Sequence, residues 1–408
     1  MCISEKYTTF VAEKEQTAQK MKIRIVTLGC KLNFAESSQL MNTLLAKGHQ
    51  RTGNGEEADL VIVNTCSVTD TADHKDRQAI HRVRRENPNA RIIVTGCYAR
   101  LKPQEISAMA EVDRVVLKAE DKFVPAYSKD DRTRCFLKVQ DGCNYFCTYC
   151  TIPMARGRSR NPFIDEVVDE AKKALAEGAK EIILTGVNIG DFGRTTNERF
   201  IDLLRALDAI DGDFRVRISS CEPNLLSDEI IDFVAQSHHF APHFHIPLQS
   251  GSDEVLKIMH RHYDTALFSE RIRHIREVMP DAFIGVDCMV GVRGETEERF
   301  QTYVNYVNAL PVSQLHVFTY SERANTRMLE MDLPVVPMKE RQRRSRILHA
   351  ISEQKLKAFY DSHKGKKALV LWESKKDKGL MYGFTENYIK VSCPYDKSKV
   401  NTFEEVTI

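Results

Sequence analysis

Short apolar runs alternate with amphipathic stretches along the first third of the chain. The runs KIRIVTLG, DLVIVNT, RIIVTG and VDRVVL are rich in β-branched residues, and helical patterns such as AESSQLMNTLLAKG and KDRQAIHRVRREN lie between them. Strands that alternate with helices form a parallel sheet covered by helices. We therefore expect an open parallel α/β sheet domain over residues 21–130.

A second and longer series follows a polar stretch at residues 120–133, which we interpret as a linker. Its strands are CFLKVQ, EIILTG, FRVRISS, HFHIPLQ, FIGVDCMVG and LHVFTYS. Helical patterns accompany these strands at residues 164–177, 200–210, 228–236, 265–278, 297–309 and about 338–360. Six strand–helix units predict a partial (βα)6 TIM-like barrel over residues 131–361, with functional residues at the carboxyl ends of the strands. Because a complete barrel has about eight units, we expect an open side that admits a large substrate.

The two ends of the chain follow other patterns. Residues 1–20 are polar and lack the apolar segment of a signal peptide, so we expect a disordered extension and no export. Residues 362–408 contain KALVLWES, LMYGFTEN and YIKVSC, which are typical of short antiparallel strands in a small β-barrel. The aromatic residues of this module lie among lysines and form either an RNA-binding surface or the core of the module: Trp372, Tyr382, Phe384 and Tyr388.

Composition narrows the class of protein. The 408 residues carry a formal net charge of +2 and contain no apolar run long enough to cross a membrane, so we expect a cytoplasmic protein. Eleven cysteines, an odd number without a secretion signal, argue against a disulfide framework and for thiols that act as ligands. Local basic runs such as HRVRREN and KERQRRSR are more often solvated helix faces than nucleic-acid sites.

Three of these cysteines lie together in DGCNYFCTYC, directly after the first strand of the second series: Cys143, Cys147 and Cys150. Thiolates are soft ligands that select zinc, copper(I) or iron–sulfur clusters. A [4Fe–4S] cluster normally takes four cysteines, so three would leave one iron open to a small molecule. The alternatives are a zinc site completed from elsewhere in the chain, or cysteines that simply belong to the core.

Three further cysteines each end a predicted strand of the first domain: Cys30, Cys66 and Cys97. Strand ends of an open parallel sheet share one edge, where ligands bind. A lone cysteine there is usually a small buried hydrophobe, but three in equivalent positions favour a second metal cluster, again with one open iron.

The C-x3-C-x2-C spacing, with Tyr149 before its last cysteine, resembles the radical S-adenosylmethionine superfamily. In that family the open iron chelates S-adenosylmethionine, and one electron cleaves it to methionine and a 5′-deoxyadenosyl radical. Both cysteine sets together resemble the methylthiotransferases, on the motifs NTCSVT, TGCYA, DGCNYFCTYCTIPMARGRSR, LTGVNIG, PLQSGSDEVLKIM, GVRGETEE and HVFTYS. The sequences NTCSVT and CTYCTIPMARGRSR are most similar to those of the bacterial tRNA (N6-L-threonylcarbamoyladenosine(37)-C(2))-methylthiotransferases.

This resemblance implies a transferase that methylthiolates carbon 2 of N6-threonylcarbamoyladenosine at tRNA position 37. It implies two [4Fe–4S] clusters, one on each cysteine set, and S-adenosylmethionine as methyl donor and radical source. The implied partners are the anticodon stem-loop of tRNA, an electron donor such as a flavodoxin or ferredoxin, and a sulfur source. Two enzyme alternatives stay open, namely isopentenyladenosine in tRNA and a ribosomal-protein side chain. A non-enzymatic metal-cluster RNA-binding protein is the third.

The resemblance also assigns site residues. Positions at strand ends, together with Tyr149, are implied to bind S-adenosylmethionine: Gly186, Asn188, Ser220, Glu222, Gln249, Gly291 and Phe318. Glu222 could instead cap the helix that follows it. The run ARGRSR after the cysteine loop is implied to contact RNA through Arg156, Arg158 and Arg160, and its alternative is a solvent-facing loop. The terminal module resembles a TRAM-like RNA-binding barrel, although it is short. The stretches MHRHY and SERANT depart from the family's usual sequence.

Overall fold

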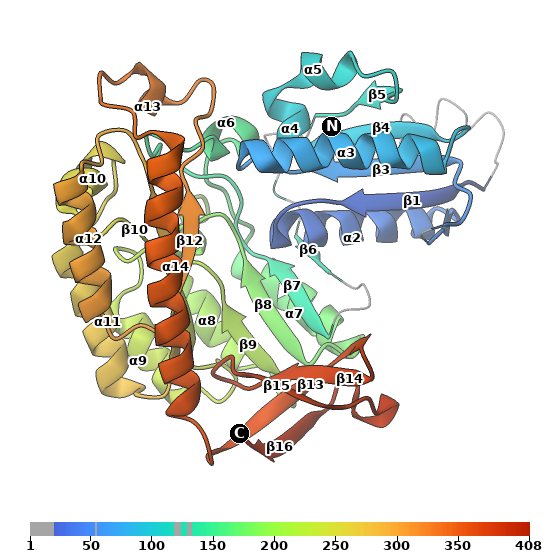
Figure 1. The fold of residues 1–408 in the computed structure, drawn as a ribbon. Coiled ribbons are helices and arrows are strands. Elements are labelled where there is room, and N and C mark those ends of the chain that lie inside the picture. The colour runs from blue at the N-terminus through green and yellow to red at the C-terminus, as the bar shows by residue number, and fades with distance from the viewer. Residues whose placement is uncertain (1–19, 54, 118–122, 124, 129–132) are drawn as a thin grey trace.

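The computed structural model describes residues 20–53, 55–117, 123, 125–128 and 133–408 (Figure 1). The extension expected at residues 1–20 lies outside the described residues except for Lys20, as does part of the expected linker. In the described part, none of the helices combines the length and apolarity that crossing a bilayer requires.

The first part of the chain is a five-stranded parallel sheet in the order β2-β1-β3-β4-β5, which confirms the expected parallel α/β arrangement. Its strands are β1 (Lys22–Thr27), β2 (Gln50–Arg51), β3 (Leu60–Thr65), β4 (Arg91–Gly96) and β5 (Arg114–Val115). Its helices are α2 (Lys31–Ala46), α3 (Asp70–Glu86), α4 (Cys97–Leu101) and α5 (Pro103–Ser107). The central strand β3 is buried along its whole length, because helices cover both faces of a parallel sheet.

The second part contains six parallel strands, β7 to β12, in two sheets. The sheet orders are β6-β7-β8-β9, in which β6 is an additional strand, and β10-β11-β12. Two isolated bridges, Val216 to Phe240 and Ser220 to His245, connect β9 with the next sheet. The strands are β7 (Arg134–Lys138), β8 (Glu181–Thr185), β9 (Arg215–Ile218), β10 (His243–Gln249), β11 (Phe283–Val290) and β12 (Gln314–Thr319). The expected linker holds a short extra strand, β6 (Ala126–Tyr127), which pairs antiparallel with β7. The expected strands of this part are therefore all present.

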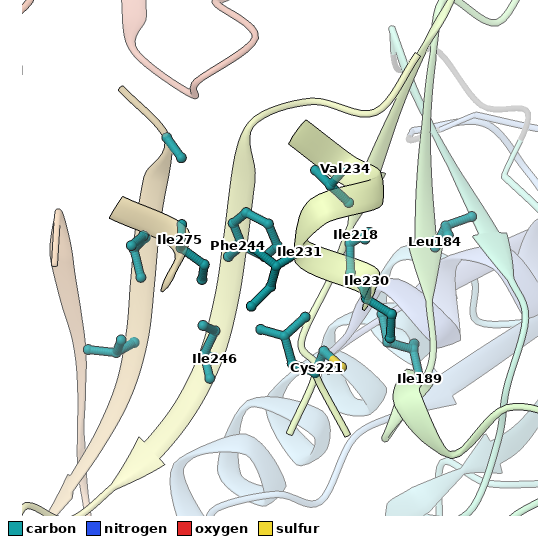
Figure 2. Close-up of a cluster of buried hydrophobic side chains, with 14 of the residues drawn as sticks. Leu184, Ile189, Ile218, Cys221, Ile230, Ile231, Val234, Phe244, Ile246 and Ile275 are labelled. Carbon is teal, nitrogen blue, oxygen red and sulfur yellow. The ribbon is translucent and has the colours of Figure 1, made fainter. Parts of the chain in front are cut away.

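Helices follow these strands and cover their outer face (Figure 1). They are α6 (Ile152–Arg156), α7 (Ile164–Ala176), α8 (Phe200–Asp208), α9 (Asp228–Gln236), α10 (Asp253–Ile258), α11 (Thr265–Val278), α12 (Glu297–Ala309), α13 (Arg327–Glu330) and α14 (Met338–Asp361), with 3₁₀ turns at η1 (Ile189–Asp191) and later at η2 (Lys397–Lys399). Figure 2 shows the resulting core, in which Ile218, Phe244 and Ile246 point toward Ile231 of α9. Cys221 lies in the same core, which gives this cysteine a packing role.

Side chains alternate across each strand, so residues between the core positions point to the opposite, inner face. On this face lie charged and polar groups, Lys138, Glu181, Arg217, His245, Asp287 and His316, beside a few apolar side chains such as Phe136, Ile183 and Phe283. A polar inner face facing away from the helices is the first indication of where ligands bind.

The terminal module is an antiparallel sheet in the order β15-β14-β13-β16. Its strands are β13 (Lys367–Asp377), β14 (Leu380–Phe384), β15 (Lys390–Pro394) and β16 (Phe403–Thr407), the last of which the sequence pattern missed. Trp372 is buried in the module, and Tyr388 packs against His243 and Phe283 of the second part. Arg215 and Arg217 donate to backbone carbonyls of the module. The module thus packs against the amino ends of the strands.

The first part lies at the opposite, carboxyl ends (Figure 1). Arg323, which follows β12, donates to the carboxylates of Asp70 and Asp73 at 2.6 and 3.0 Å and to the Ser67 hydroxyl at 2.6 Å. These contacts place the cysteine-bearing edge of the first sheet next to the cysteine loop of the second part.

Candidate active site

The cysteine loop after β7 is held in one conformation by its backbone. Asp141 and Arg160 form a bridge that closes the loop at its base. Gly142 has φ +69°, and a Cβ atom at this position would lie 2.0 Å from the carbonyl oxygen of Arg158. Only glycine meets both demands, so the residue before Cys143 is fixed by local geometry.

The three thiols of the loop lie close together. Burial, together with negative charge on Cys147, raises the pKa of Cys143 to about 11 and that of Cys150 to about 12. Cys147 Sγ accepts a hydrogen bond of 3.1 Å from the Arg261 guanidinium. Three adjacent thiolates in a buried site need a strongly positive centre, which a metal cluster supplies.

The second cysteine set converges at the edge of the first sheet. Cys30 is the N-cap of α2, Cys66 directly follows β3, and Cys97 is the first residue of α4. Burial raises the pKa of Cys66 to about 12, and both Cys30 and Cys97 contribute to the shift. A Cβ atom at position 29 would lie 2.7 Å from Cys66 Sγ, so Gly29 makes room for this approach. The described cysteines are free thiols.

Arg156 links the two cysteine sets. Its guanidinium is buried and donates to Asp141 Oδ1 at 2.9 Å, Glu36 Oε1 at 3.2 Å and Asn33 Oδ1 at 2.6 Å. Asp141 begins the cysteine loop, whereas the other two acceptors lie on α2, just after Cys30. Negative charge on Cys97 and Cys30 contributes to raising the pKa of this guanidinium well above its usual value. One buried cation therefore lies between both sets.

The neighbouring arginines differ from Arg156 in exposure. Arg160 is half-buried and donates to Asp141 at 3.0 Å, while Arg158 is exposed and lies over the ring of Phe146, 4.8 Å from its centroid. Of the three arginines for which the sequence predicts RNA contact, only Arg158 thus presents its charge to solvent, and Arg156 holds domains together.

Two predicted cofactor residues carry unsatisfied polar atoms. Asn188 Oδ1 and Gln249 Oε1 are buried and have no hydrogen-bond partner within the described residues. Such atoms are rare unless a ligand or water completes them. Gly186 supports the same pocket, because a Cβ atom there would lie 2.6 Å from Ile189 and 2.9 Å from Gln140 Oε1. These strand ends therefore fit a polar cofactor.

Arg261, which sequence reasoning missed, contacts two of the predicted cofactor residues and one thiol of the loop. It forms an ion pair with Glu222 and donates to the Tyr149 hydroxyl at 3.4 Å and to Cys147. Burial raises the pKa of Glu222 and the Arg261 charge opposes this shift. Arg261 belongs to the stretch MHRHY, and the departure of this stretch from the family's usual sequence was the one available signal. Only the structure shows that Arg261 contacts a cysteine of the loop.

The remaining predicted positions lie at or just after the ends of other strands. Ser220 is bridged to His245, and Phe318 near the end of β12 is 48% exposed. Gly291 has φ +82°, and a Cβ atom there would lie 2.3 Å from Arg341 of α14. Its N–H donates to Glu295 Oε1 at 2.9 Å. Gly291 therefore contributes to packing as well as to the strand end.

Comparison with known proteins agrees with this geometry. Residues 22–117 match the model of Uncharacterized protein family UPF0004, and residues 137–307 match that of the Radical SAM superfamily. The solved structure of the radical S-adenosylmethionine methyltransferase TsrM from Kitasatospora setae has a TM-score of 0.51 at 15% identity, over 74% of this chain and 75% of that one. At this identity the likeness concerns the fold alone.

Two curated relatives align along nearly the whole chain. Threonylcarbamoyladenosine tRNA methylthiotransferase MtaB of Bacillus subtilis (strain 168) is 37% identical, over 90% of this chain and 88% of its own length. The tRNA-2-methylthio-N(6)-dimethylallyladenosine synthase of Desulfitobacterium hafniense (strain Y51) is 30% identical, over 95% of both chains.

The parallel strands and the cysteine loop, together with these matches, define a radical S-adenosylmethionine enzyme. The chain belongs to the MtaB family of tRNA methylthiotransferases. Membership implies S-adenosylmethionine and a [4Fe–4S] cluster as cofactors. The three-thiol loop and the orphaned amide oxygens of Asn188 and Gln249 fit these groups.

Proposed function

We propose that this enzyme inserts a methylthio group at carbon 2 of N6-threonylcarbamoyladenosine at position 37 of tRNA, with two three-cysteine clusters. The observation that carries the proposal is the pairing of the two cysteine sets through Arg156 and Arg323. A second converging cysteine set, linked to the first by Arg156, supports a role in sulfur supply in addition to radical generation. The names of relatives at 33–37% identity support the threonylcarbamoyl substrate over the dimethylallyl one, which the relatives at 30–31% carry.

The two cysteine sets have separate roles in this proposal. Carbon 2 of adenine is not acidic, so replacement of its hydrogen requires a radical rather than a general base. When bound, the cluster at Cys143, Cys147 and Cys150 with S-adenosylmethionine would supply that radical, and the cluster at Cys30, Cys66 and Cys97 would supply the methylated sulfur. We interpret the six strands as one partial TIM-like barrel, whose carboxyl ends hold the first set.

The protein's own residues position and screen the reactants. Arg261 and Glu222 place paired charge beside Cys147, and Asn188 and Gln249 offer amide oxygens to the amino group of S-adenosylmethionine. Docking of the first domain covers the carboxyl ends and excludes water, which protects a reactive radical. Arg158, exposed beside the loop, supports phosphate or base contact with the anticodon stem-loop.

Variants that lack one cysteine of either set separate radical generation from sulfur supply. With anaerobically reconstituted enzyme and an anticodon stem-loop RNA that carries threonylcarbamoyladenosine, we expect Cys143→Ser to abolish both 5′-deoxyadenosine and product. We expect Cys66→Ser to retain 5′-deoxyadenosine formation but to give no methylthio product. Full product formation by Cys66→Ser would overturn the two-cluster proposal, and Cys393→Ser, in the terminal module, serves as the matched control.

A further inference from the structure

A second group of potential metal ligands lies on the inner face of the six strands. His245 of β10, Asp287 of β11 and His316 of β12 come from three adjacent strands, and each side chain is partly accessible. None of these residues was singled out in the sequence, because a histidine or aspartate within a strand carries no local signal. Their side chains meet only because the strands are neighbours and all three point to the inner face.

The donor atoms converge on one point. His245 Nε2 lies 2.7 Å from Asp287 Oδ1, His316 Nδ1 lies 3.4 Å from the same oxygen, and the two nitrogens are 3.3 Å apart. Ligands of a tetrahedral zinc ion at roughly 2.0–2.1 Å are about 3.3 Å from one another. The two longer separations thus equal those of a tetrahedral site, and the shorter one needs only a small side-chain adjustment.

The surrounding structure holds this arrangement in place. Asp287 is paired in register with His316 across β11 and β12, and regular strands fix side chains more firmly than loops do. Gly285 lies one inner-face position before Asp287, and a Cβ atom there would lie 3.2 Å from the His316 ring. Glycine at this position leaves the ring its space.

Charges near the group balance one another. Arg217 and Lys31 bring positive charge to the inner face, and both act on groups of this cluster or its neighbours. Glu181 and Glu222 bring negative charge, and Glu222 is near enough for the Asp287 charge to raise its pKa. A divalent cation would therefore enter an interior in which charges of both signs are already present.

We propose that His245, Asp287 and His316 form a binding site for a first-row divalent transition metal, zinc foremost, separate from both cysteine sets. Two imidazoles and one carboxylate are a three-ligand set of the kind that leaves a coordination position open. The three side chains lie on the inner face of the strands, not in the helix-covered core, and each is partly accessible. The proposal concerns metal binding and does not depend on which nucleoside the enzyme modifies.

Zinc binding to the iron-loaded enzyme tests this site, because filled clusters keep the six cysteines from competing. The reconstituted protein is incubated anaerobically with zinc chloride, desalted, and analysed for iron and zinc by mass spectrometry. We expect about one retained zinc per chain, with only nitrogen and oxygen neighbours in zinc-edge X-ray absorption. His245→Ala and His316→Ala should each lower zinc affinity at least about tenfold while iron content stays unchanged.

A matched control uses another histidine–carboxylate pair. His274 Nε2 lies 2.7 Å from Asp232 Oδ1 on the outer helices, the same separation as in the proposed site. His274→Ala should retain zinc fully. Absence of bound zinc, sulfur neighbours in the absorption spectrum, or equal loss in His274→Ala would overturn the proposal and leave the three residues as a hydrogen-bonded network.

Discussion

Single buried charges shape the surroundings of the two cysteine sets and the amino ends of the strands. Arg156 lies between the sets, Arg261 lies beside Cys147, and Glu181 joins strand β8 to two arginines of β9. Each of these groups is desolvated and each has a full complement of partners, which is the condition under which a buried charge is tolerated. Loss of one partner should therefore have effects much larger than loss of a surface ion pair.

Arg261→Gln should impair radical generation without loss of the cluster. The substitution removes the counter-charge that opposes the burial-raised pKa of Glu222, so the pKa of that carboxyl rises further, and Cys147 loses a hydrogen bond. We expect 5′-deoxyadenosine formation to fall about 100-fold or more, as measured by chromatography, with iron content unchanged. Arg205→Gln, in an exposed ion-pair group, is the control. Normal cleavage in Arg261→Gln would show that this arginine does not act on the cofactor.

Glu181→Gln should destabilise the fold. Glu181 accepts from Arg215 at 2.6 Å and from Arg217 at 3.1 Å, and removal of its charge leaves two buried guanidinium groups without their partner. We expect a loss of about 3–5 kcal/mol in the free energy of unfolding, measured by denaturant titration of the apoprotein. Glu229→Gln, on the surface, should cost no more than about 1 kcal/mol.

The same carboxylate predicts a pH dependence. Its charged partners hold the pKa of Glu181 at about 2, below its ordinary 4.5. Its contribution to stability is therefore complete above about pH 4.5 and is lost as the pH falls toward 2. Wild-type protein should lose stability through this window more steeply than Glu181→Gln, and parallel pH profiles for the two proteins would contradict this assignment.

At the scale of elements, the sequence pattern predicted most helices and the main strands. The bounds expected for α9, α11 and α12 agree with the structure, because each begins at a clear N-terminal signal and has a regular apolar stripe. The pattern missed β2, β6 and β16, which carry no clear local strand signal and form strands by pairing with β1, β7 and β13. It located the six cysteines but not Arg261, Arg323 or the inner-face histidines, since only tertiary packing brings these to the site.

The cysteine loop offers a test of an element's geometry. Gly142→Ala forces a Cβ atom into the Arg158 carbonyl, at a backbone angle that side chains disfavour. Under the proposed two-cluster arrangement, this variant should lose about half of its iron, because only the loop cluster is affected, as measured by iron assay after reconstitution. Gly178 has φ +95° but no atom within 4 Å of its added Cβ, so Gly178→Ala should retain full iron. Full iron in Gly142→Ala would contradict the argument.

At the scale of the whole molecule, three parts of the chain are arranged along the axis of the six strands. The terminal module packs at the amino ends of the six strands, and the first domain lies at their carboxyl ends (Figure 1). The stretch SERANT, which departs from the family's usual sequence, contains Arg323 and so forms one of the ionic contacts between the first domain and the strands, beside the pairs of Glu36 with Lys138 and Arg156. Chemistry that needs both cysteine sets depends on this contact.

Arg323→Ala should uncouple the two sets. The substitution leaves Asp73 buried without this partner and weakens docking, while neither cysteine set is touched. We expect full iron content and continued 5′-deoxyadenosine formation, but methylthio product reduced at least about tenfold, because positioning errors of about 1 Å cost about 100-fold. Arg293→Gln, whose partner Glu322 lies within the same part of the chain, is the control. If Arg323→Ala forms methylthio product at the wild-type rate, docking of the first domain does not depend on this contact.

The most direct test of the central claim is nucleoside mass spectrometry of tRNA from cells that lack this gene. The account predicts that 2-methylthio-N6-threonylcarbamoyladenosine disappears, that unmodified N6-threonylcarbamoyladenosine accumulates, and that wild-type protein but not Cys66→Ser or Cys143→Ser restores the product. Unchanged levels of the methylthio nucleoside, or loss of the dimethylallyl form in its place, would contradict it.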